Sequence, residues 1–206
     1  MPYETAAAYL PRSTSLRSLK RAAAGCRGCD LYEHATQTVF GEGSRGARIV
    51  LVGEQPGDRE DIEGEPFVGP AGAMLQSAIE EAGIDRSGVY VTNAVKHFRF
   101  VVRGKRRIHQ KPRAIEIDAC RPWLDAEIAA VDPRTIVAMG ATAARSLLGR
   151  PVRIGDRRGK PLTSDGRTIF VTIHPASVLR QPDRNARLAA FARLVADLRA
   201  AGETAR

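Results

Sequence analysis

The pattern of apolar and polar positions along the chain predicts strands that alternate with helices. Short apolar runs rich in β-branched residues predict four buried strands, at 48–54, 89–95, 135–140 and 168–175. Longer segments with helical patterning predict helices at 15–25, 71–83, 113–131, 141–149 and 184–202. Pro122 is expected to bend or divide the helix over 113–131, and residues 1–12 are expected to form a loose tail.

This alternation predicts one α/β domain over residues 1–206, with three layers and a central, mainly parallel four-stranded sheet. A chain of 206 residues is long enough to bury one substantial core. In such folds ligands bind outside the carboxyl ends of the strands. Glu54, Asn93 and His174 stand at or just past the ends of three predicted strands, so we expect them to meet in one crevice.

The charge of the chain favours a polyanionic partner, most simply nucleic acid. Hydrophobic residues make up 43% and charged residues 27%, as in globular proteins, and the net charge is +9. Arginine is frequent throughout, so the net charge alone is weak support, and clustering matters more. No acidic residue occurs between Arg86 and Ile115. The basic residues that gather there are Lys96, Arg99, Arg103, Lys105, Arg106, Arg107, Lys111 and Arg113.

The sequence gives no sign of secretion or membrane insertion. Glu4 stands early, no long apolar segment follows it, and no stretch is long and apolar enough to span a bilayer. Three cysteines, an odd number, do not suggest a secreted disulfide framework. We therefore expect a cytoplasmic, nucleoid-associated monomer without a membrane partner.

A polar, glycine-rich segment, residues 53–72, joins the first predicted strand to a helix. Gly53 and Gly57 would let backbone amides approach a planar ligand, and Pro56 stiffens the turn. The segment lacks the glycine patterns of phosphate-binding loops, and its carboxylates would repel a phosphate. Phe67 within it offers a ring on which a base can stack.

Several motifs together resemble the iron–sulfur uracil-DNA glycosylases of the family 4 type. They are GEQPG, EGEPFVGPAG, TNAVKH, HPAS, CRGC and ACRPWL, and the resemblance extends from Cys26 to the terminal helix. GEQPG combined with the inserted KRRIH resembles the UdgX-type branch, whose members bond covalently to the abasic sugar that they create. The resemblance implies the uracil-DNA glycosylase fold and a uracil-containing DNA partner, preferably single-stranded.

For the base, the resemblance implies that Phe67 stacks on a flipped uracil and that Asn93 reads its edge. The amide of Asn93 would accept from N3–H and donate to O4. Cytosine presents the opposite pattern, and such mismatches are worth roughly 10⁴ in discrimination. Gly53, Gln55 and Gly57 complete the implied uracil-binding set, with backbone amides near Gln55 acting like an oxyanion hole. The alternative for Asn93 is an ordinary strand end.

For bond cleavage, the resemblance implies two catalytic groups. His174 would donate a hydrogen bond to the charge that develops on uracil O2. Glu54 would stabilise the sugar cation or activate a nucleophile as a general base. The alternatives are a structural histidine before a proline and a carboxylate that caps a helix or braces a loop.

The inserted segment carries the third implied catalytic residue, His109. In the covalent branch the loop over 103–113 brings this imidazole to C1′ in place of water. Lys105, Arg106 and Arg107 would bind phosphates, and Arg107 could also hold the loop or His109 in position. The alternative is a DNA-contact loop whose histidine is incidental.

The segment HPASVLRQP adds candidate DNA contacts. Leu179 could wedge into the gap that a flipped nucleotide leaves, or it could anchor the loop to the core. Ser177 and Arg180 are candidate phosphate contacts beside it.

The cysteines suggest a metal centre. The resemblance implies a [4Fe–4S] cluster held by Cys26, Cys29, His97 and Cys120, with His97 at a position where the wider family has cysteine. Structural zinc is an alternative for the same ligand set. A redox C-x-x-C is less fitting, because this pair follows a helix rather than opening one after a strand.

Two further functions remain open. A turnover glycosylase, in which the loop only grips DNA, predicts free abasic DNA and no denaturant-stable adduct. A non-catalytic iron–sulfur module for DNA binding or redox chemistry predicts binding without release of uracil. The polar residues at three strand ends argue against the second of these.

Overall fold

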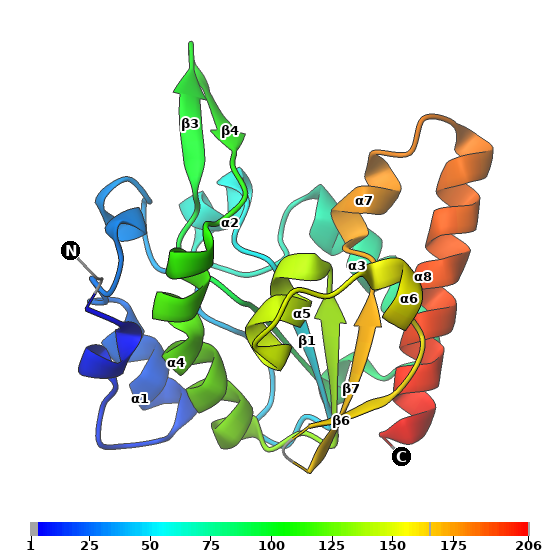
Figure 1. The fold of residues 1–206 in the computed structure, drawn as a ribbon, viewed down its shortest axis with the longest axis horizontal. Helices are drawn as coiled ribbons and strands as arrows, with labels where there is room; N and C mark the ends of the chain where they lie inside the picture. Colours follow the sequence, from blue (N-terminus) through cyan, green and yellow to red (C-terminus); the bar gives the residue numbers. More distant parts are fainter. Residues whose placement is uncertain (1–3, 165, 206) are drawn as a thin grey trace.

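A five-stranded sheet forms the centre of the molecule in the computed structural model, which describes residues 4–164 and 166–205 (Figure 1). The strand order is β2-β1-β5-β7-β6. Four strands run parallel and overlap the segments expected from the sequence: β1 (Ile49–Gly53), β2 (Val89–Asn93), β5 (Thr135–Met139) and β7 (Arg167–Thr172). The expected count of four is wrong, because β6 (Leu162–Ser164) adds a short antiparallel strand at one edge.

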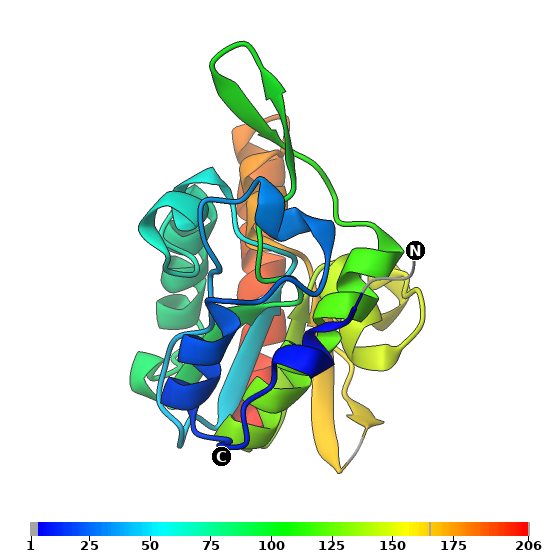
Figure 2. The same ribbon diagram turned by 90° about the vertical axis from the view of Figure 1, so that its left-hand side faces the viewer.

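Helices cover both faces of this sheet and give the expected three layers (Figures 1 and 2). The helices are α1 (Leu16–Ala23), α2 (Asp58–Glu63), α3 (Pro70–Glu81), α4 (Ala114–Val131), α5 (Ala141–Leu148), α6 (Ile154–Arg157), α7 (Pro175–Leu179) and α8 (Arg184–Thr204). Short 3₁₀ turns lie at η1 (Ala6–Tyr9), η2 (Asp30–Glu33) and η3 (Arg86–Gly88). No helix in the described residues is long and apolar enough to cross a membrane.

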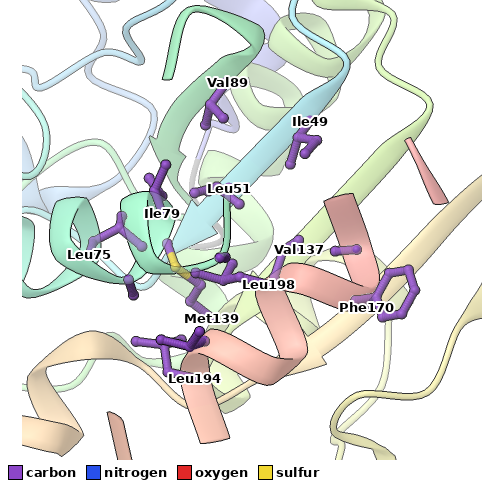
Figure 3. Packing of buried hydrophobic residues seen from close by; sticks show 14 of the residues in the cluster. Ile49, Leu51, Leu75, Ile79, Val89, Val137, Met139, Phe170, Leu194 and Leu198 are labelled. Atoms are coloured by element: carbon purple, nitrogen blue, oxygen red, sulfur yellow. The ribbon is translucent and has the colours of Figure 1, made fainter. Parts of the chain in front are cut away.

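Each strand contributes to two cores, because successive side chains point to opposite faces of the sheet. Leu51 and Val137 face α3 and α8, where they meet Ile79 and Leu198 (Figure 3). The intervening strand residues face α4 and α5 in a second core. Burial on both faces explains why the strands are apolar at nearly every position.

The N-terminal segment differs from the loose tail expected over 1–12. Within the described part, Ala6–Tyr9 form η1, and Ala6 is buried in a third apolar cluster with Leu19 and Trp123. The helix expected over 113–131 is α4, and it continues through Pro122 rather than dividing there.

A β-hairpin replaces the irregular loop expected from residue 103 onward. Strands β3 (Phe100–Arg103) and β4 (Arg106–His109) pair antiparallel and stand away from the body, on the side toward which the sheet strands point (Figures 1 and 2). Gly104, with φ of 58°, is the first central residue of the two-residue turn, a position that favours glycine. A hairpin carries His109 more rigidly than a loop would.

Candidate active site

The carboxyl ends of the parallel strands surround a cavity of about 260 Å³. It collects side chains from the ends of β1, β2 and β7, from the loop before α3 and from the hairpin. The predicted site residues that line it are Glu54, Gln55, Gly57, Phe67, Asn93, His109, His174 and Arg180. Three distant strand ends and the hairpin thus meet in one place, as the strand-end rule leads us to expect.

Gly53 allows two of these side chains to approach the end of β1 closely. A Cβ atom built on Gly53 would lie 2.3 Å from Asn93 Oδ1 and 2.7 Å from Phe67 Cζ. Glycine is therefore required by space. The rings of Phe67 and His174 lie 6.3 Å apart with an interplanar angle of 26°, so two nearly parallel rings flank the cavity.

Asn93 is buried, with 3% of its surface exposed. None of the hydrogen bonds found among the described residues uses its side-chain amide, although its backbone carbonyl accepts one from Lys96. The amide lines the cavity. Since buried polar groups are normally hydrogen-bonded, this amide is placed to bond a ligand.

His174 has a defined tautomer. Its Nδ1 accepts a hydrogen bond of 3.2 Å from the Ala176 N–H at the start of α7, so the proton of the neutral ring lies on Nε2. Burial, together with the smaller effects of the charges of Arg180 and His109, lowers the pKa of His174 to about 4. At neutral pH the ring is an uncharged donor through Nε2.

Glu54 and His109 face each other across the cavity wall. His109 Nε2 lies 3.4 Å from Glu54 Oε1, and the other carboxylate oxygen accepts a hydrogen bond from the Thr142 hydroxyl. Burial lowers the pKa of His109; the Glu54 carboxylate opposes this shift, and Arg180 adds to it. The result is a neutral imidazole beside a carboxylate. The sequence analysis did not identify Thr142 as a site residue. Its position just after the third expected strand was the signal that could have placed it at this edge of the sheet.

The side chain of Gln55 holds the hairpin segment. Its Nε2 donates to the carbonyl oxygens of Arg99 (3.2 Å) and Gln110 (2.9 Å), and its Oε1 accepts from the Arg99 N–H (3.1 Å). These bonds join both ends of the hairpin segment to the end of β1. Binding of uracil by backbone amides near Gln55 stays a prediction, and these side-chain bonds leave it untouched.

Arg107 is paired with carboxylates of the protein itself. Its guanidinium pairs with Asp58 and Asp61 of α2, each at 2.5 Å, and lies over the rings of Phe98 and Phe100. A phosphate contact by Arg107 stays a prediction, and it would require the guanidinium to leave these two carboxylates. Its second expected role, holding the loop, agrees with these contacts.

The other cations of the basic cluster divide into two groups. Lys96, Arg99 and Arg113 form ion pairs with buried glutamates, so they add little free charge. Arg103, Lys105, Arg106 and Lys111 are exposed and have no ion pair within the described part of the chain, and the first three lie at the hairpin tip. The hairpin tip therefore carries most of the free cationic charge of the cluster.

Two further predicted site residues form hydrogen bonds within the protein, and their contacts with uracil and DNA stay predictions. The Gly57 N–H donates to Glu60 (3.1 Å), which also accepts from the Gly69 N–H (2.8 Å), so the Gly57 amide is engaged in bracing the loop. Glu60 was overlooked, although a glutamate three residues after a helix start is a capping signal. The Ser177 hydroxyl donates to the His174 carbonyl oxygen at 2.6 Å instead of pointing a free proton at a phosphate.

Leu179 and Arg180 end α7 beside the cavity. Leu179 is half-buried, and Arg180 is exposed and lines the cavity. Leu179 is absent from the apolar residues that pack on the core clusters of the described chain, so the core does not account for its position.

Comparisons with known proteins agree with this geometry. The family model for the uracil DNA glycosylase superfamily matches residues 40–199. The chain belongs to this superfamily. It is 40% identical to the type-4 uracil-DNA glycosylase of Thermotoga maritima over 157 residues, 75% of this chain and 78% of that protein. It is 34% identical to the type-4 uracil-DNA glycosylase of Pyrobaculum aerophilum over 177 residues, 81% of this chain and 86% of that protein.

In this uracil-DNA glycosylase superfamily member the three cysteines gather in one place. Cys26, Cys29 and Cys120 are buried in the third apolar cluster, and burial raises the pKa of Cys29 to about 11 and of Cys120 to about 12. Trp123, one turn after Cys120, buries an indole N–H that has no partner among the described residues. An anionic sulfur centre would satisfy this indole donor.

The described residues do not form a coordination site for a single metal ion. No three histidine, cysteine or acidic side chains among them lie close enough together to hold one. Tetrahedral zinc, with Zn–S bonds of about 2.3 Å, needs its ligands in one compact group, so this geometry gives zinc no support. His97 donates from Nε2 to the Thr38 hydroxyl (2.8 Å), because that hydroxyl gives its own proton to the Ala23 carbonyl oxygen. Only Nδ1 of His97 remains for a ligand bond.

Proposed function

We propose that this protein excises uracil from DNA, preferably single-stranded DNA, and then stays bonded through His109 to C1′ of the abasic sugar. The observation that carries the proposal is the position of His109. Its imidazole lies in the wall of the cavity that also contains Asn93, Phe67 and His174, and its Nε2 is 3.4 Å from the Glu54 carboxylate. Membership of the superfamily supports the base-excision part of the proposal.

Uracil is recognised by shape and by hydrogen bonds. Phe67 stacks on the flipped base, and the free amide of Asn93 accepts from N3–H and donates to O4. Gly53 makes room for that amide, because a Cβ at this position would lie 2.3 Å from Asn93 Oδ1.

Cleavage of the glycosidic bond sends its electron pair to the leaving uracil and leaves a cationic sugar. His174 donates from Nε2 to uracil O2 and stabilises the anion. Glu54 stabilises the sugar cation across the cavity, and Thr142 fixes one of its carboxylate oxygens. The buried and neutral state of His174 favours donation without an added positive charge.

Capture of the sugar completes the reaction. Glu54, whose Oε1 lies 3.4 Å from His109 Nε2, accepts the Nε2 proton as the electron pair of that N–H bond forms the bond to C1′. The proton passes to the carboxylate, so the ring ends neutral in the adduct and is a poor leaving group. Proximity favours this step over attack by water when the nitrogen lies about 3–3.5 Å from C1′.

The hairpin and α7 grip the DNA. Lys105 and Arg106 bind phosphates, and Arg180 and Leu179 approach the gap beside the flipped nucleotide. Ser177 serves mainly to fix the His174 backbone. Single-stranded DNA is favoured because no base pair has to be broken when the uracil leaves the stack.

We also infer a structural [4Fe–4S] cluster with Cys26, Cys29 and Cys120 as ligands and His97 as the fourth. The shared burial of the three thiols, the unpartnered indole of Trp123 and the type-4 relatives support it. The cluster would tie the N-terminal segment to the turn after β2 and would take no part in bond cleavage. Visible absorbance with iron and sulfide analysis tests the assignment.

One experiment tests the main proposal directly. Protein mixed with a uracil-containing oligonucleotide and run on a denaturing gel is expected to give a slower band, in amounts that match the protein added. Free abasic DNA without this band would favour a turnover glycosylase instead. Binding with no release of uracil would favour a non-catalytic DNA-binding module.

A further inference from the structure

A lysine and a glutamate form a fully buried ion pair beside the candidate active site. Lys96 lies just after β2 with a side chain 1% exposed, and Glu127 of α4 has a side chain that is 0% exposed. The lysine ammonium and one glutamate oxygen are in direct contact. Neither group touches the cavity, and the chemistry proposed above uses neither of them.

All three protons of the ammonium are used. Lys96 Nζ donates to the Thr92 hydroxyl and to the Asn93 carbonyl oxygen, each at 2.7 Å, and to Glu127 Oε2. The other glutamate oxygen accepts from the Gly41 N–H and the Tyr90 hydroxyl, each at 2.9 Å. Every donor and acceptor of the pair therefore has a defined partner.

Stability alone does not account for this arrangement. Two charges lose their hydration on burial, and replacing a buried ion pair with uncharged groups of similar volume is often neutral or stabilising. A satisfied buried network does, however, fix the positions of the groups that it binds. The groups fixed here are the last two residues of β2, Thr92 and Asn93.

The same turn also holds the end of β1. The N–H groups of Ala94 and Val95 donate to the carbonyl oxygens of Gly53 (2.9 Å) and Glu54 (3.1 Å). The Asn93 amide lies directly against Gly53, where a Cβ atom would come within 2.3 Å of Oδ1. A small movement of the Asn93 backbone would therefore displace the amide within the cavity.

We propose that Lys96, held by Glu127, is a positioning residue that sets the rate and base selectivity of uracil release through Asn93. It bonds the Asn93 carbonyl and orients the amide without touching the base. The inference rests on the proposed function, since it assigns a role to a group outside the pocket for that same reaction.

The test is a double-mutant cycle on uracil release. The paired variant Lys96→Met with Glu127→Gln removes both charges and keeps an acceptor for Gly41 and Tyr90. We expect the single-turnover rate constant to fall about 10- to 100-fold, with the Kd for DNA unchanged. In an Asn93→Ala background the same pair is expected to cost less than about 3-fold, because Lys96 acts through that amide.

A matched network provides the control. Asp197 of α8 accepts from the strand-end residue Thr172 (2.6 Å) and from Arg158 (2.8 Å), but it has no bond to Asn93. Any fall in the rate constant caused by Asp197→Asn is expected to multiply with the fall caused by Asn93→Ala, because the two changes act independently. If the Lys96 pair fails to fold, Thr92→Val, which removes the hydroxyl between Lys96 and Glu127, takes its place in the cycle.

The outcomes separate the two proposals. If folded wild-type protein releases no uracil, the proposed function fails. The positioning role is overturned if the wild type is active but the variant Lys96→Met, Glu127→Gln keeps the full rate of uracil release. It is also overturned if the fall in rate in that variant multiplies with the fall caused by Asn93→Ala. A fall in the ratio of uracil to cytosine release in the Lys96 pair, absent from Asp197→Asn, supports it.

Discussion

At the scale of the residue, two histidines of one cavity have distinct environments. His174 is fixed by a bond from the Ala176 N–H to Nδ1, so it presents a donor. His109 has half of its side chain exposed and faces a carboxylate, so it presents a nitrogen to an incoming group. The sequence indicated both residues through motifs, but only contacts assign their protons, because tautomers depend on neighbours distant in sequence.

Replacing His109 separates capture from excision. His109→Ala is expected to abolish the denaturant-stable adduct while uracil release stays within about tenfold of the wild type, because His174 and Glu54 remain in place. Mass spectrometry of the protein after reaction measures the adduct, and a uracil-release assay measures excision. The exposed His34, changed to alanine, is the control. An adduct that persists in His109→Ala would identify another nucleophile.

The pH dependence of capture follows from the lowered pKa of His109. Burial favours the neutral ring, so the nucleophile is available above its folded pKa and is lost as the pH falls through that value. The rate of adduct formation is expected to be flat from pH 8 down past the ordinary histidine value of about 6.5 and to fall only below it. Rapid-quench measurements between pH 4.5 and 8 test this. A half-maximal rate above pH 7 would contradict a lowered pKa of His109.

At the scale of the element, the hairpin shows what sequence patterns detect and what they miss. The buried strands were detectable because they are apolar on both faces. Strands β3 and β4 bury no core face, and their arginines suggested a loop, although Gly104–Lys105 was a usable turn signal. The ion pairs of Lys96 and Arg107 could not be predicted, because their carboxylate partners are far away in the sequence.

Arg107 is expected to hold the hairpin, and with it His109, against α2. Arg107→Ala leaves the buried carboxylate of Asp61 with only the Thr36 N–H, which should cost about 1–3 kcal/mol of stability. Adduct formation should slow by more than uracil release does, because the hairpin positions the capturing group. Thermal unfolding and the two rates measure these effects.

The neighbouring Arg106→Ala is the matched control for this change. Arg106 is exposed and unpaired within the described chain, so its removal should leave stability and the ratio of the two rates unchanged. Equal slowing of both rates in Arg107→Ala would show that the guanidinium does not position His109.

At the scale of the whole molecule, the position of the site follows from the topology. Parallel strands end on one side of the sheet, so Glu54, Asn93 and His174 could be expected together from the order of elements alone. The strand order and the edge strand β6 were beyond such reasoning, since β6 has only three residues and its pairing is set by packing. The burial of Ala6 in the third apolar cluster was also missed, because the turn that carries it has only four residues and shows no periodic pattern.

The net charge of +9 acts on DNA only through cations that are free to meet phosphates. Lys105 and Arg106 are exposed at the hairpin tip, whereas Arg107 is already paired with two carboxylates. For single-stranded DNA each phosphate contact contributes about 0.7 to the slope of log Kd against log salt concentration. The double variant Lys105→Gln, Arg106→Gln should therefore lower that slope by about 1.4, as measured by fluorescence anisotropy.

Arg107→Gln is the control for this measurement, and it should weaken binding without changing the slope. It removes one formal charge from the strand that also carries Arg106, so the comparison distinguishes free cations from neutralised ones. A fall in slope of about 0.7 for Arg107→Gln would mean that this arginine leaves Asp58 and Asp61 to bind a phosphate. The hairpin would then close on DNA by exchanging protein carboxylates for phosphates, and its position over the cavity would depend on salt as well.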